Sequence, residues 1–548
     1  MSNERGANRR RSTRRVIGIL IACATLALAT PASALTPRRA TVKTRSVLKG
    51  MRRDRLDFAL RKDDASSPNG FAVGMTRRGA SGRLREREID FATLHANGLL
   101  EEPSGNPIGA ASGYFALNST QDAHMFYTYF PVRSTAKEKK DPRDYPVIIW
   151  LTGGPGCSSE LAIFYENGPY GLSRDEKTGD LALREREFAW NDAGNVIFVD
   201  SPVGTGFSYS GSRKDAAKDE KTVANDLLEF LQEFLVTHPE LADNDVYVTG
   251  ESYAGHYVPA FAHRIFEANK SGEGPVLINL RGFAIGNGLT DPTIQYGAYT
   301  DYSIGNDIVS EEVAKQATEK YPECARLAKE CADADLTRAG RHKCMDAVDF
   351  CMDIPETLLE DAARRNNGVP MNVYDIRKSC DSDLCYDFSD AEKYLNLPEV
   401  QKALGVSKQW TMCDPQVHQN LMADWMRDYE PLIPPMLEGG IRAMIYAGEN
   451  DFICNWLGNL RWVKAMEWSG QKGFNGESPQ PFVVDQAGET DVIGGEVREY
   501  GLLSFVKISQ AGHMVPMDQP RNALTMIERF VQGASIARGE KPVASETR

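Results

Sequence analysis

The chain has 548 residues, of which 42% are hydrophobic and 25% are charged. This length and balance are typical of a globular protein with a large core and exclude a disordered chain. The formal net charge of −13 argues against nucleic acid as a partner. Basic residues are concentrated in the first hundred positions, so the remainder is strongly acidic. This asymmetry indicates an N-terminal segment that docks by charge and is later removed.

The N-terminus has the features of a cleaved signal peptide over residues 1–34. A basic stretch precedes an apolar run from Val16 to Thr30, and Ala32-Ser33-Ala34 matches a cleavage signal. The run is too short to cross about 30 Å of hydrocarbon, so cleavage is favoured over a membrane anchor. We therefore expect the secretory pathway, no stable membrane span, and delivery to a vacuole or lysosome or to the exterior.

Residues 35–108 are predicted to be a propeptide that acts as an intramolecular partner of the domain after it. They are rich in arginine, with recurring glycine and serine and little apolar periodicity. A flexible N-terminal extension is the alternative. We expect a catalytic domain over 109–535, a short tail over 536–548, and a monomer or homodimer.

Six short apolar runs, most of them stopped by glycine, predict buried parallel strands. Patterns with helical spacing lie between them, including 223–235 and 524–531. The alternation predicts an α/β fold whose mixed, mostly parallel sheet carries functional loops at the strand C-termini. The six runs are residues 145–151, 195–200, 245–249, 280–285, 441–447 and 503–508.

Residues 291–432 interrupt this rhythm and are predicted to be a helical cap insertion. They contain seven of the nine cysteines that remain once the signal peptide is removed. The spacing of these cysteines along the chain suits nested bridges Cys324–Cys351 and Cys331–Cys344. It also suits a small loop closed by Cys380–Cys385. Because the tight C-x-x-C pairs of a zinc site are absent, we expect no metal. An odd cysteine count leaves at least one thiol unpaired within the chain.

Two sequons fit a chain in the secretory pathway. Asn118-Ser119-Thr120 and Asn269-Lys270-Ser271 are candidate glycosylation sites. Such triplets also occur by chance, so they add weight only together with the signal peptide.

The strongest chemical motif is Gly250-Glu251-Ser252-Tyr253-Ala254-Gly255, which lies between a predicted strand and a predicted helix. This arrangement is typical of a nucleophile elbow, in which small neighbours allow Ser252 to project alone. The usual second glycine is Ala254 here. We predict that Ser252 is a hydrolase nucleophile.

A serine nucleophile requires a histidine base and an orienting acid, and hydrolases of this type carry them in the order Ser, acid, His. His513 follows the last predicted strand, whereas His342 and His418 lie in the insertion. His256 follows Ser252 by one helical turn, where a structural role is expected. The acid follows the preceding strand, where both Glu449 and Asp451 qualify by position.

The loop Gly153-Gly154-Pro155-Gly156 follows an early strand and offers free backbone N–H groups. These groups could stabilise a tetrahedral oxyanion together with the N–H of Tyr253, although an ordinary tight turn is the simpler alternative. Asp200 also ends a strand but precedes Ser252, so it is expected to be structural.

Four long motifs in this order resemble the serine carboxypeptidases, above all carboxypeptidase Y and the plant vacuolar type III enzymes. The shorter segment Asn372–Lys378 in the insertion adds to the likeness, which covers roughly residues 110–535. The four motifs are Trp150–Ser159, Gly250–Pro259, Ala447–Asn459 and Gly512–Pro520.

The resemblance implies an α/β-hydrolase fold, no cofactor, a cleavable propeptide, and removal of C-terminal residues from peptides and proteins at acidic pH. It implies Ser252, Asp451 and His513 as the triad. It further implies Gly154 and Tyr253 as oxyanion donors, a Cys157–Cys413 bridge, and a free thiol at Cys454 near the site.

The resemblance also assigns the substrate carboxylate to Thr152, Gly153, Glu166 and Glu251. Two close, partly buried carboxyls do not both ionise cheaply, so one keeps a proton that it can donate to the substrate. Carboxypeptidase Y has asparagine where this chain has Thr152. Because family members with threonine there include acyltransferases, an acyltransferase is the main alternative function. An inactive binding partner and a simple esterase are weaker alternatives.

Overall fold

The computed structural model describes residues 76–78, 83–101, 109–134, 138–380, 382, 384–486 and 489–540. The predicted signal peptide, much of the predicted propeptide and most of the predicted tail lie outside these ranges. Among the described helices, none is long and apolar enough to cross a bilayer.

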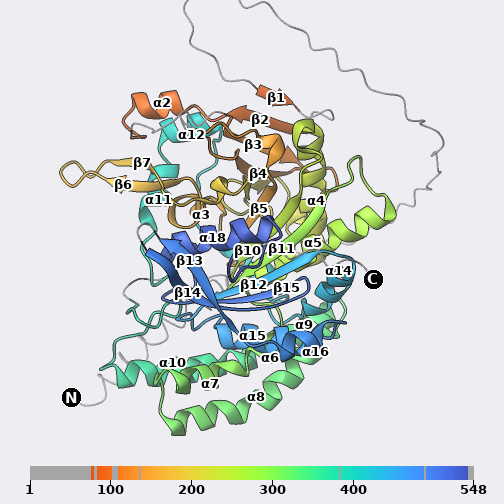
Figure 1. The fold of residues 1–548 in the computed structure, drawn as a ribbon, viewed down its shortest axis with the longest axis vertical. Helices are drawn as coiled ribbons and strands as arrows, with labels where there is room; N and C mark the ends of the chain where they lie inside the picture. Colours follow the sequence, from red (N-terminus) through yellow and green to blue (C-terminus); the bar gives the residue numbers. More distant parts are fainter. Residues whose placement is uncertain are drawn as a thin grey trace, which may run out of the picture.

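Parallel strands form the centre of the main sheet, in the spatial order β8-β5-β10-β11-β12-β15 (Figure 1). Each of these strands coincides with one of the predicted apolar runs, so the predicted parallel sheet is confirmed. Their bounds are β5 Val147–Thr152, β8 Asn195–Val199, β10 Val246–Glu251, β11 Leu280–Gly286, β12 Arg442–Gly448 and β15 Leu503–Ile508.

Antiparallel strands extend the sheet at both edges and make it mixed. A separate hairpin, β6 with β7, projects at the left of Figure 1. These strands are β1 Thr76–Arg78, β2 Leu84–Glu88, β3 Ala111–Ala116, β4 Ala123–Phe130, β6 Tyr170–Arg174, β7 Leu181–Glu185, β9 Tyr209–Ser210, β13 Gln480–Gln486 and β14 Glu489–Tyr500.

Apolar side chains cover both faces of the sheet because successive residues of a strand point to opposite sides. In β5, Ile149 belongs to the core shared with helices α4 (Glu220–Thr237) and α5 (Ala254–Ser271). Its neighbour Ile148 belongs to the core shared with α3 (Glu160–Tyr165) and α18 (Pro520–Val531). Burial on both faces explains why these strands appear in the sequence as continuous apolar runs.

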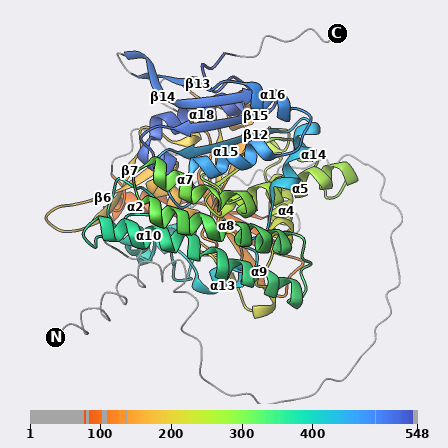
Figure 2. The same ribbon diagram turned by 90° about the horizontal axis from the view of Figure 1, so that it is seen from below.

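The predicted insertion is helical, and its long helices lie together at one end of the molecule, at the bottom of Figure 1 and in front in Figure 2. Disulfides Cys324–Cys351 and Cys331–Cys344 join α8 to α9. The helices are α6 Pro292–Gln295, α7 Ala298–Gly305, α8 Glu311–Ala332, α9 Arg338–Cys351, α10 Asp353–Arg365, α11 Ser389–Leu395, α12 Pro398–Leu404 and α13 Pro415–Leu421. Helices α14 Ile433–Glu438, α15 Trp456–Ala465, α16 Gln471–Gly476 and α17 Val515–Asp518 follow.

Residues 83–101 fall within the predicted propeptide, yet they form part of the sheet and its covering. Strand β2 pairs with β3, and helix α2 (Phe91–Ala96) follows it. Glu86 is buried in β2, where it accepts hydrogen bonds from the Tyr127 hydroxyl at 2.7 Å and from His238 Nε2 at 2.8 Å. The sequence of β2 gives no apolar strand pattern, because four of its five residues are charged. Glu86 is buried by Tyr127 and His238, which lie far away along the chain.

Candidate active site

Ser252 occupies the sharp turn between β10 and α5, with a backbone φ of +67°. Such a left-handed conformation is uncommon for a non-glycine residue, and here it projects the side chain at the end of the sheet. A Cβ placed on Gly250 would lie 2.5 Å from the Leu151 oxygen, and one on Gly255 would lie 2.4 Å from the Leu289 oxygen. The elbow therefore requires glycine at these two positions.

Asp451 follows β12 and is fully buried. Its Oδ2 lies 2.8 Å from His513 Nδ1, while its Oδ1 accepts the backbone N–H of Ile453 at 3.1 Å. Glu449, the other positional candidate, instead accepts the backbone N–H of Gln510 at 2.8 Å. The geometry therefore pairs Asp451, and not Glu449, with the histidine.

His513 lies in the loop after β15 and is almost fully buried. Its Nε2 has no hydrogen-bond partner among the described residues, and its ring lines the same cavity as Ser252. One ring nitrogen is thus engaged by an acid and the other is available toward the nucleophile, as a general base requires.

The glycine loop after β5 runs directly against the elbow. A Cβ on Gly153 would lie 2.4 Å from the backbone nitrogen of Tyr253 and 2.6 Å from the Glu251 oxygen. Gly154, with φ of +113°, lines the cavity beside Ser252 and Tyr253. The two predicted oxyanion donors therefore lie on adjacent segments at the nucleophile.

Glu166 and Glu251 line the same cavity, and both are buried, with 1% and 3% of their surfaces exposed. Burial raises the pKa of Glu166 to about 7, against a smaller lowering by its hydrogen bond to Glu251. Burial, followed by the charge of Glu166 and the shared hydrogen bond, raises the pKa of Glu251 well above its ordinary value. At acidic pH the pair therefore retains protons.

Thr152 ends β5 and also lines the cavity. Its hydroxyl oxygen accepts a hydrogen bond from the Trp150 indole at 3.0 Å, and its backbone N–H donates to Ser159 at 3.0 Å. The indole occupies an acceptor position of the hydroxyl and leaves the hydroxyl hydrogen free to donate.

The cavity has a volume of about 230 Å³ and is largely apolar away from these groups. Insertion residues such as Tyr386, Met412 and Trp425 line it, as does His418, whereas His342 does not. The cap therefore contributes to the substrate site.

Cysteines also border the cavity. The Cys157–Cys413 bridge lines it, and the buried thiol of Cys454 is unpaired. The bridge Cys380–Cys385 is also formed. Together with the two bridges in α8 and α9, these are the three pairings expected from the cysteine spacing and the one implied by the family resemblance.

Asn287 is the residue that sequence reasoning missed. It follows β11 with φ of +41°, and its side-chain amide donates to Asp451 Oδ2 at 2.8 Å. Its sequence Gly286-Asn287-Gly288 indicated only a turn, because its contact lies 164 positions further along the chain.

Asp200 and His256, which were both expected to have structural roles, bond to neighbouring residues outside the cavity. Asp200 accepts hydrogen bonds from the Ser158 hydroxyl at 2.5 Å and from the Ser159 and Phe207 backbones. His256 is fully buried and its Nδ1 lies 3.3 Å from Asp424. Neither residue lines the cavity that contains Ser252.

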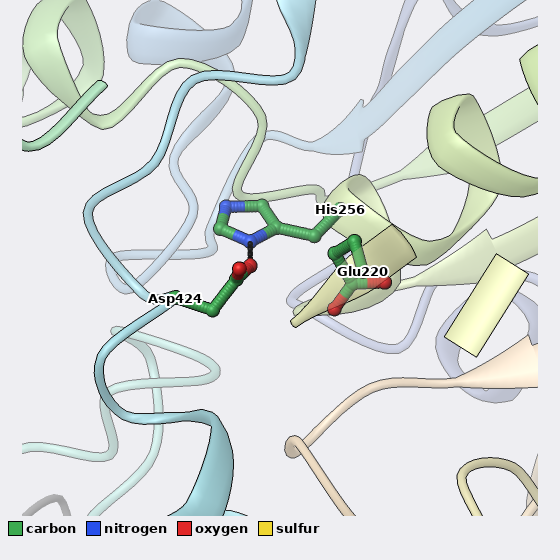
Figure 3. A group of neighbouring side chains, drawn as sticks. All are labelled: Glu220, His256 and Asp424. Atoms are coloured by element: carbon green, nitrogen blue, oxygen red, sulfur yellow. Dashed lines mark hydrogen bonds and ion pairs between the residues drawn. The ribbon is translucent and has the colours of Figure 1, made fainter. Parts of the chain in front are cut away.

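Within the described residues, one group of side chains places metal-ligating atoms close together, namely Glu220, His256 and Asp424 (Figure 3). Asp424 also accepts hydrogen bonds from the hydroxyls of Tyr253 and Tyr429. Burial, with the charge of Asp424, raises the pKa of Glu220 well above its usual value. Asp424 is therefore engaged by two tyrosine hydroxyls and by His256, whereas neither carboxyl oxygen of Glu220 has a hydrogen-bond partner among the described residues.

The model of the serine carboxypeptidase family matches residues 101–533 of this chain. The chain belongs to the serine carboxypeptidase family. It is a serine-type carboxypeptidase, a peptide hydrolase of the α/β-hydrolase fold, as the sequence motifs predicted.

Relatives of similar length support this assignment. The chain is 46% identical over 456 residues to serine carboxypeptidase 3 of Oryza sativa subsp. japonica, a match that covers 83% of this chain and 84% of the relative. It is 43% identical over 530 residues to serine carboxypeptidase 3 of Hordeum vulgare, covering 95% and 96%.

A solved structure shares the fold. The prohormone-processing carboxypeptidase Kex1(delta)p of Saccharomyces cerevisiae superposes with a TM-score of 0.68 at 25% identity. The match covers 80% of this chain and 95% of that one.

Proposed function

We propose that this carboxypeptidase releases C-terminal amino acids at acidic pH through an acyl-enzyme formed on Ser252. The buried pair Glu166 and Glu251, in the same cavity as the nucleophile, is the observation that carries this proposal. A simple esterase has no use for two protonated carboxyls beside its serine, whereas a free peptide terminus offers them a carboxylate.

In the acylation step, His513 Nε2 takes the proton of the Ser252 hydroxyl as its oxygen attacks the scissile carbonyl. Asp451 keeps the imidazole oriented through the 2.8 Å contact at Nδ1 and stabilises its charged form. The N–H groups of Gly154 and Tyr253 receive the oxyanion, an interaction typically worth about 100- to 1000-fold in rate per donor. His513 then gives its proton to the leaving amino group, and water hydrolyses the ester by the reverse sequence.

The substrate carboxylate lies between the carboxyl pair, the hydroxyl of Thr152 and the backbone of Gly153. A protonated carboxyl donates a hydrogen bond to it, whereas two ionised carboxylates would repel it. Binding is therefore strongest where the pair keeps its protons.

We propose that the chain enters the secretory pathway and reaches a vacuole or lysosome or the exterior after losing its signal peptide. Maturation by removal of a propeptide is part of this proposal. Residues 84–101 stay with the mature enzyme, because β2 pairs with β3 and Leu84 and Leu94 are buried in the core. N-terminal sequencing of the mature enzyme is expected to give a start before Leu84.

The test uses a fluorophosphonate probe and a blocked dipeptide at about pH 5. We expect the enzyme to be labelled at Ser252 and to release a free amino acid from the dipeptide, and Ser252→Ala to do neither. Labelling without release, combined with transfer of an acyl group from an ester donor to an alcohol, would instead support the acyltransferase alternative.

A further inference from the structure

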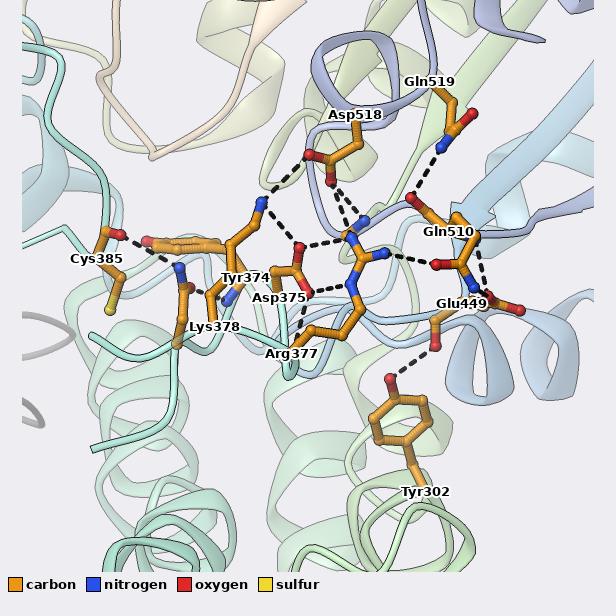
Figure 4. A network of polar contacts seen from close by, with 12 residues as sticks. Tyr302, Tyr374, Asp375, Arg377, Lys378, Cys385, Glu449, Gln510, Asp518 and Gln519 are labelled. Carbon is orange, nitrogen blue, oxygen red and sulfur yellow. Dashed lines mark hydrogen bonds and ion pairs between the residues drawn. The ribbon is translucent and has the colours of Figure 1, made fainter. Parts of the chain in front are cut away.

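The segment Asn372–Lys378 of the insertion contacts the two loops that carry the catalytic acid and base. Figure 4 shows Arg377 of this segment beside Gln510 and Asp518. The main chain of the segment bonds to both loops. The backbone N–H of His513 donates to the Tyr374 oxygen at 2.7 Å, and that of Ile376 donates to the Asn450 oxygen at 2.9 Å. The segment therefore lies against the residue next to Asp451 and against His513 itself.

A further main-chain contact extends this attachment on the acid side. The Val373 oxygen accepts the N–H groups of Phe452 and Ile453, at 3.2 and 3.0 Å. Residues 450, 452 and 453 thus all bond to the segment, so the position of Asp451 depends on it.

Asp375 binds the two cationic side chains at the end of its own segment. It is fully buried and accepts two hydrogen bonds from the guanidinium of Arg377, at 2.8 and 2.7 Å. The Lys378 ammonium lies 2.9 Å from Asp375 and 3.4 Å from Asp518. A buried carboxylate whose cationic partners are removed is left as an uncompensated charge, which is costly.

Asp518 connects this ionic group to the histidine loop. Its Oδ2 accepts the backbone N–H of Gly512 at 2.7 Å, directly before His513. A Cβ on Gly512 would lie 2.4 Å from the Tyr374 oxygen and 3.0 Å from Asp375 Cβ. The segment and the histidine loop are therefore in direct contact, with no room for a side chain at this position.

On the far side, Arg377 donates to the side-chain oxygen of Gln510 at 3.1 Å. Gln510 in turn bonds through its backbone N–H to Glu449 at 2.8 Å. Contacts from Arg377 thus reach the histidine loop and, through Gln510, the acid loop (Figure 4).

We propose that Asp375, Arg377, Lys378 and Asp518 form an ionic clamp that fixes the loops of Asp451 and His513 in the geometry needed for proton transfer. These are positioning residues, since none of them lines the cavity that contains Ser252. The inference rests on the triad proposed above. It adds that the helical insertion, besides lining the pocket, fixes the relative positions of the catalytic acid and base.

The proposal is tested with Asp375→Asn and Arg377→Gln in the full enzyme, after counting active sites by burst titration. We expect Asp375→Asn to lower kcat per titrated site by about 10-fold or more, with the KM of a blocked dipeptide changed less than about threefold. A 1 Å displacement of catalytic groups is enough for a loss of that size. The rate of fluorophosphonate labelling falls by a similar factor, because it depends on the same base.

Asp361→Asn is the matched control. Asp361 is a buried acid of the insertion that accepts from Ser310 and pairs with Arg364, remote in its contacts from either catalytic loop. Its substitution is expected to lower Tm without changing kcat per site or labelling rate. A merely structural role for Asp375 would give this same pattern.

Arg377→Gln decides the question if Asp375→Asn does not fold, because the Arg377 side chain is 35% exposed. We expect a 3- to 10-fold loss in kcat per site, with a smaller loss in Arg377→Lys, which keeps the charge but not the two-point contact with Asp375. A folded Asp375→Asn or Arg377→Gln whose kcat and labelling rate stay within twofold of wild type would overturn the clamp. Failure of the wild-type enzyme to label at Ser252 would instead overturn the triad.

Discussion

Asn287 Nδ2 and His513 Nδ1 both lie 2.8 Å from the same oxygen of Asp451, Oδ2. The side-chain oxygen of Asn287 also accepts the backbone N–H of Gly448, at the end of β12. The asparagine therefore orients the acid independently of the histidine, and it fixes the acid to the strand that precedes it.

Asn287→Gly removes the amide without strain at the positive φ of this position. We expect kcat to fall about 10-fold. The rate of fluorophosphonate labelling is expected to fall by a similar factor, because it depends on the same oriented base. The exposed Asn367, also at positive φ, provides the control Asn367→Gly. An Asn287→Gly enzyme with unchanged kcat and labelling rate would contradict this role.

Thr152→Val keeps the shape of the side chain and removes its hydroxyl. If the hydroxyl donates to the substrate carboxylate, KM for a blocked dipeptide rises about 10-fold, the value of one hydrogen bond to a charged group. KM for the corresponding C-terminal amide stays unchanged. Thr249→Val, which removes a hydroxyl bonded to the Ile149 oxygen inside the sheet, is the control. Equal effects on the acid and the amide would show that Thr152 does not contact the carboxylate.

Asp226 makes the free energy of unfolding depend on pH. It is buried, and burial, with the charges of Glu229 and Asp215, raises its pKa to about 7. The folded state therefore binds this proton more tightly than the unfolded state, whose pKa is about 3.9, so the free energy of unfolding falls as pH rises from about 4 to about 7.

Asp226→Asn has no such proton to lose. We expect the free energy of unfolding of this variant to fall less steeply with pH than that of wild type, by about 1 kcal/mol per pH unit in this range. Denaturant unfolding at several pH values measures this slope. Asp180→Asn removes a charge from an exposed position and serves as the control. A slope equal to that of wild type would show that Asp226 is ionised in the folded protein.

The two sequons differ in their surroundings. Asn118 is exposed after β3, whereas the Asn269 amide donates to the Ile278 oxygen at 2.7 Å and accepts the Ile278 N–H at 3.1 Å. We expect mass spectrometry of protein from a secreting host to find a glycan at Asn118 and none at Asn269. Asn269→Gln is expected to lower Tm, and Asn118→Gln to leave the Tm of the deglycosylated protein unchanged. Full occupancy at Asn269 would contradict this assignment.

The parts of the fold that were predictable are those with local signals. The parallel strands are buried on both faces, so residues such as Ile148 and Ile149 read as continuous apolar runs. The elbow at Ser252 was visible because glycine is required where a Cβ at Gly250 would meet the Leu151 oxygen.

The parts that were missed depend on partners far away along the chain. Strand β2 is charged at every position after Leu84, and its Glu86 is buried where Tyr127 and His238 bond to it. Asn287 looked like a turn residue for the same reason, since Asp451 lies on another strand end. Local sequence carries no signal for either contact.

The most direct test of the carboxyl pair is the KM of a blocked dipeptide between pH 4.5 and 8, for wild type and for the double variant Glu166→Gln/Glu251→Gln. We predict that the wild-type KM rises as pH passes about 7, where Glu166 ionises and repels the substrate carboxylate. In the double variant, whose amides stay neutral, KM is independent of pH. Glu160→Gln, at a buried acid of α3 that does not line the cavity, is expected to behave as wild type. A double variant whose KM rises with pH as wild type does would contradict recognition of the chain terminus by this pair.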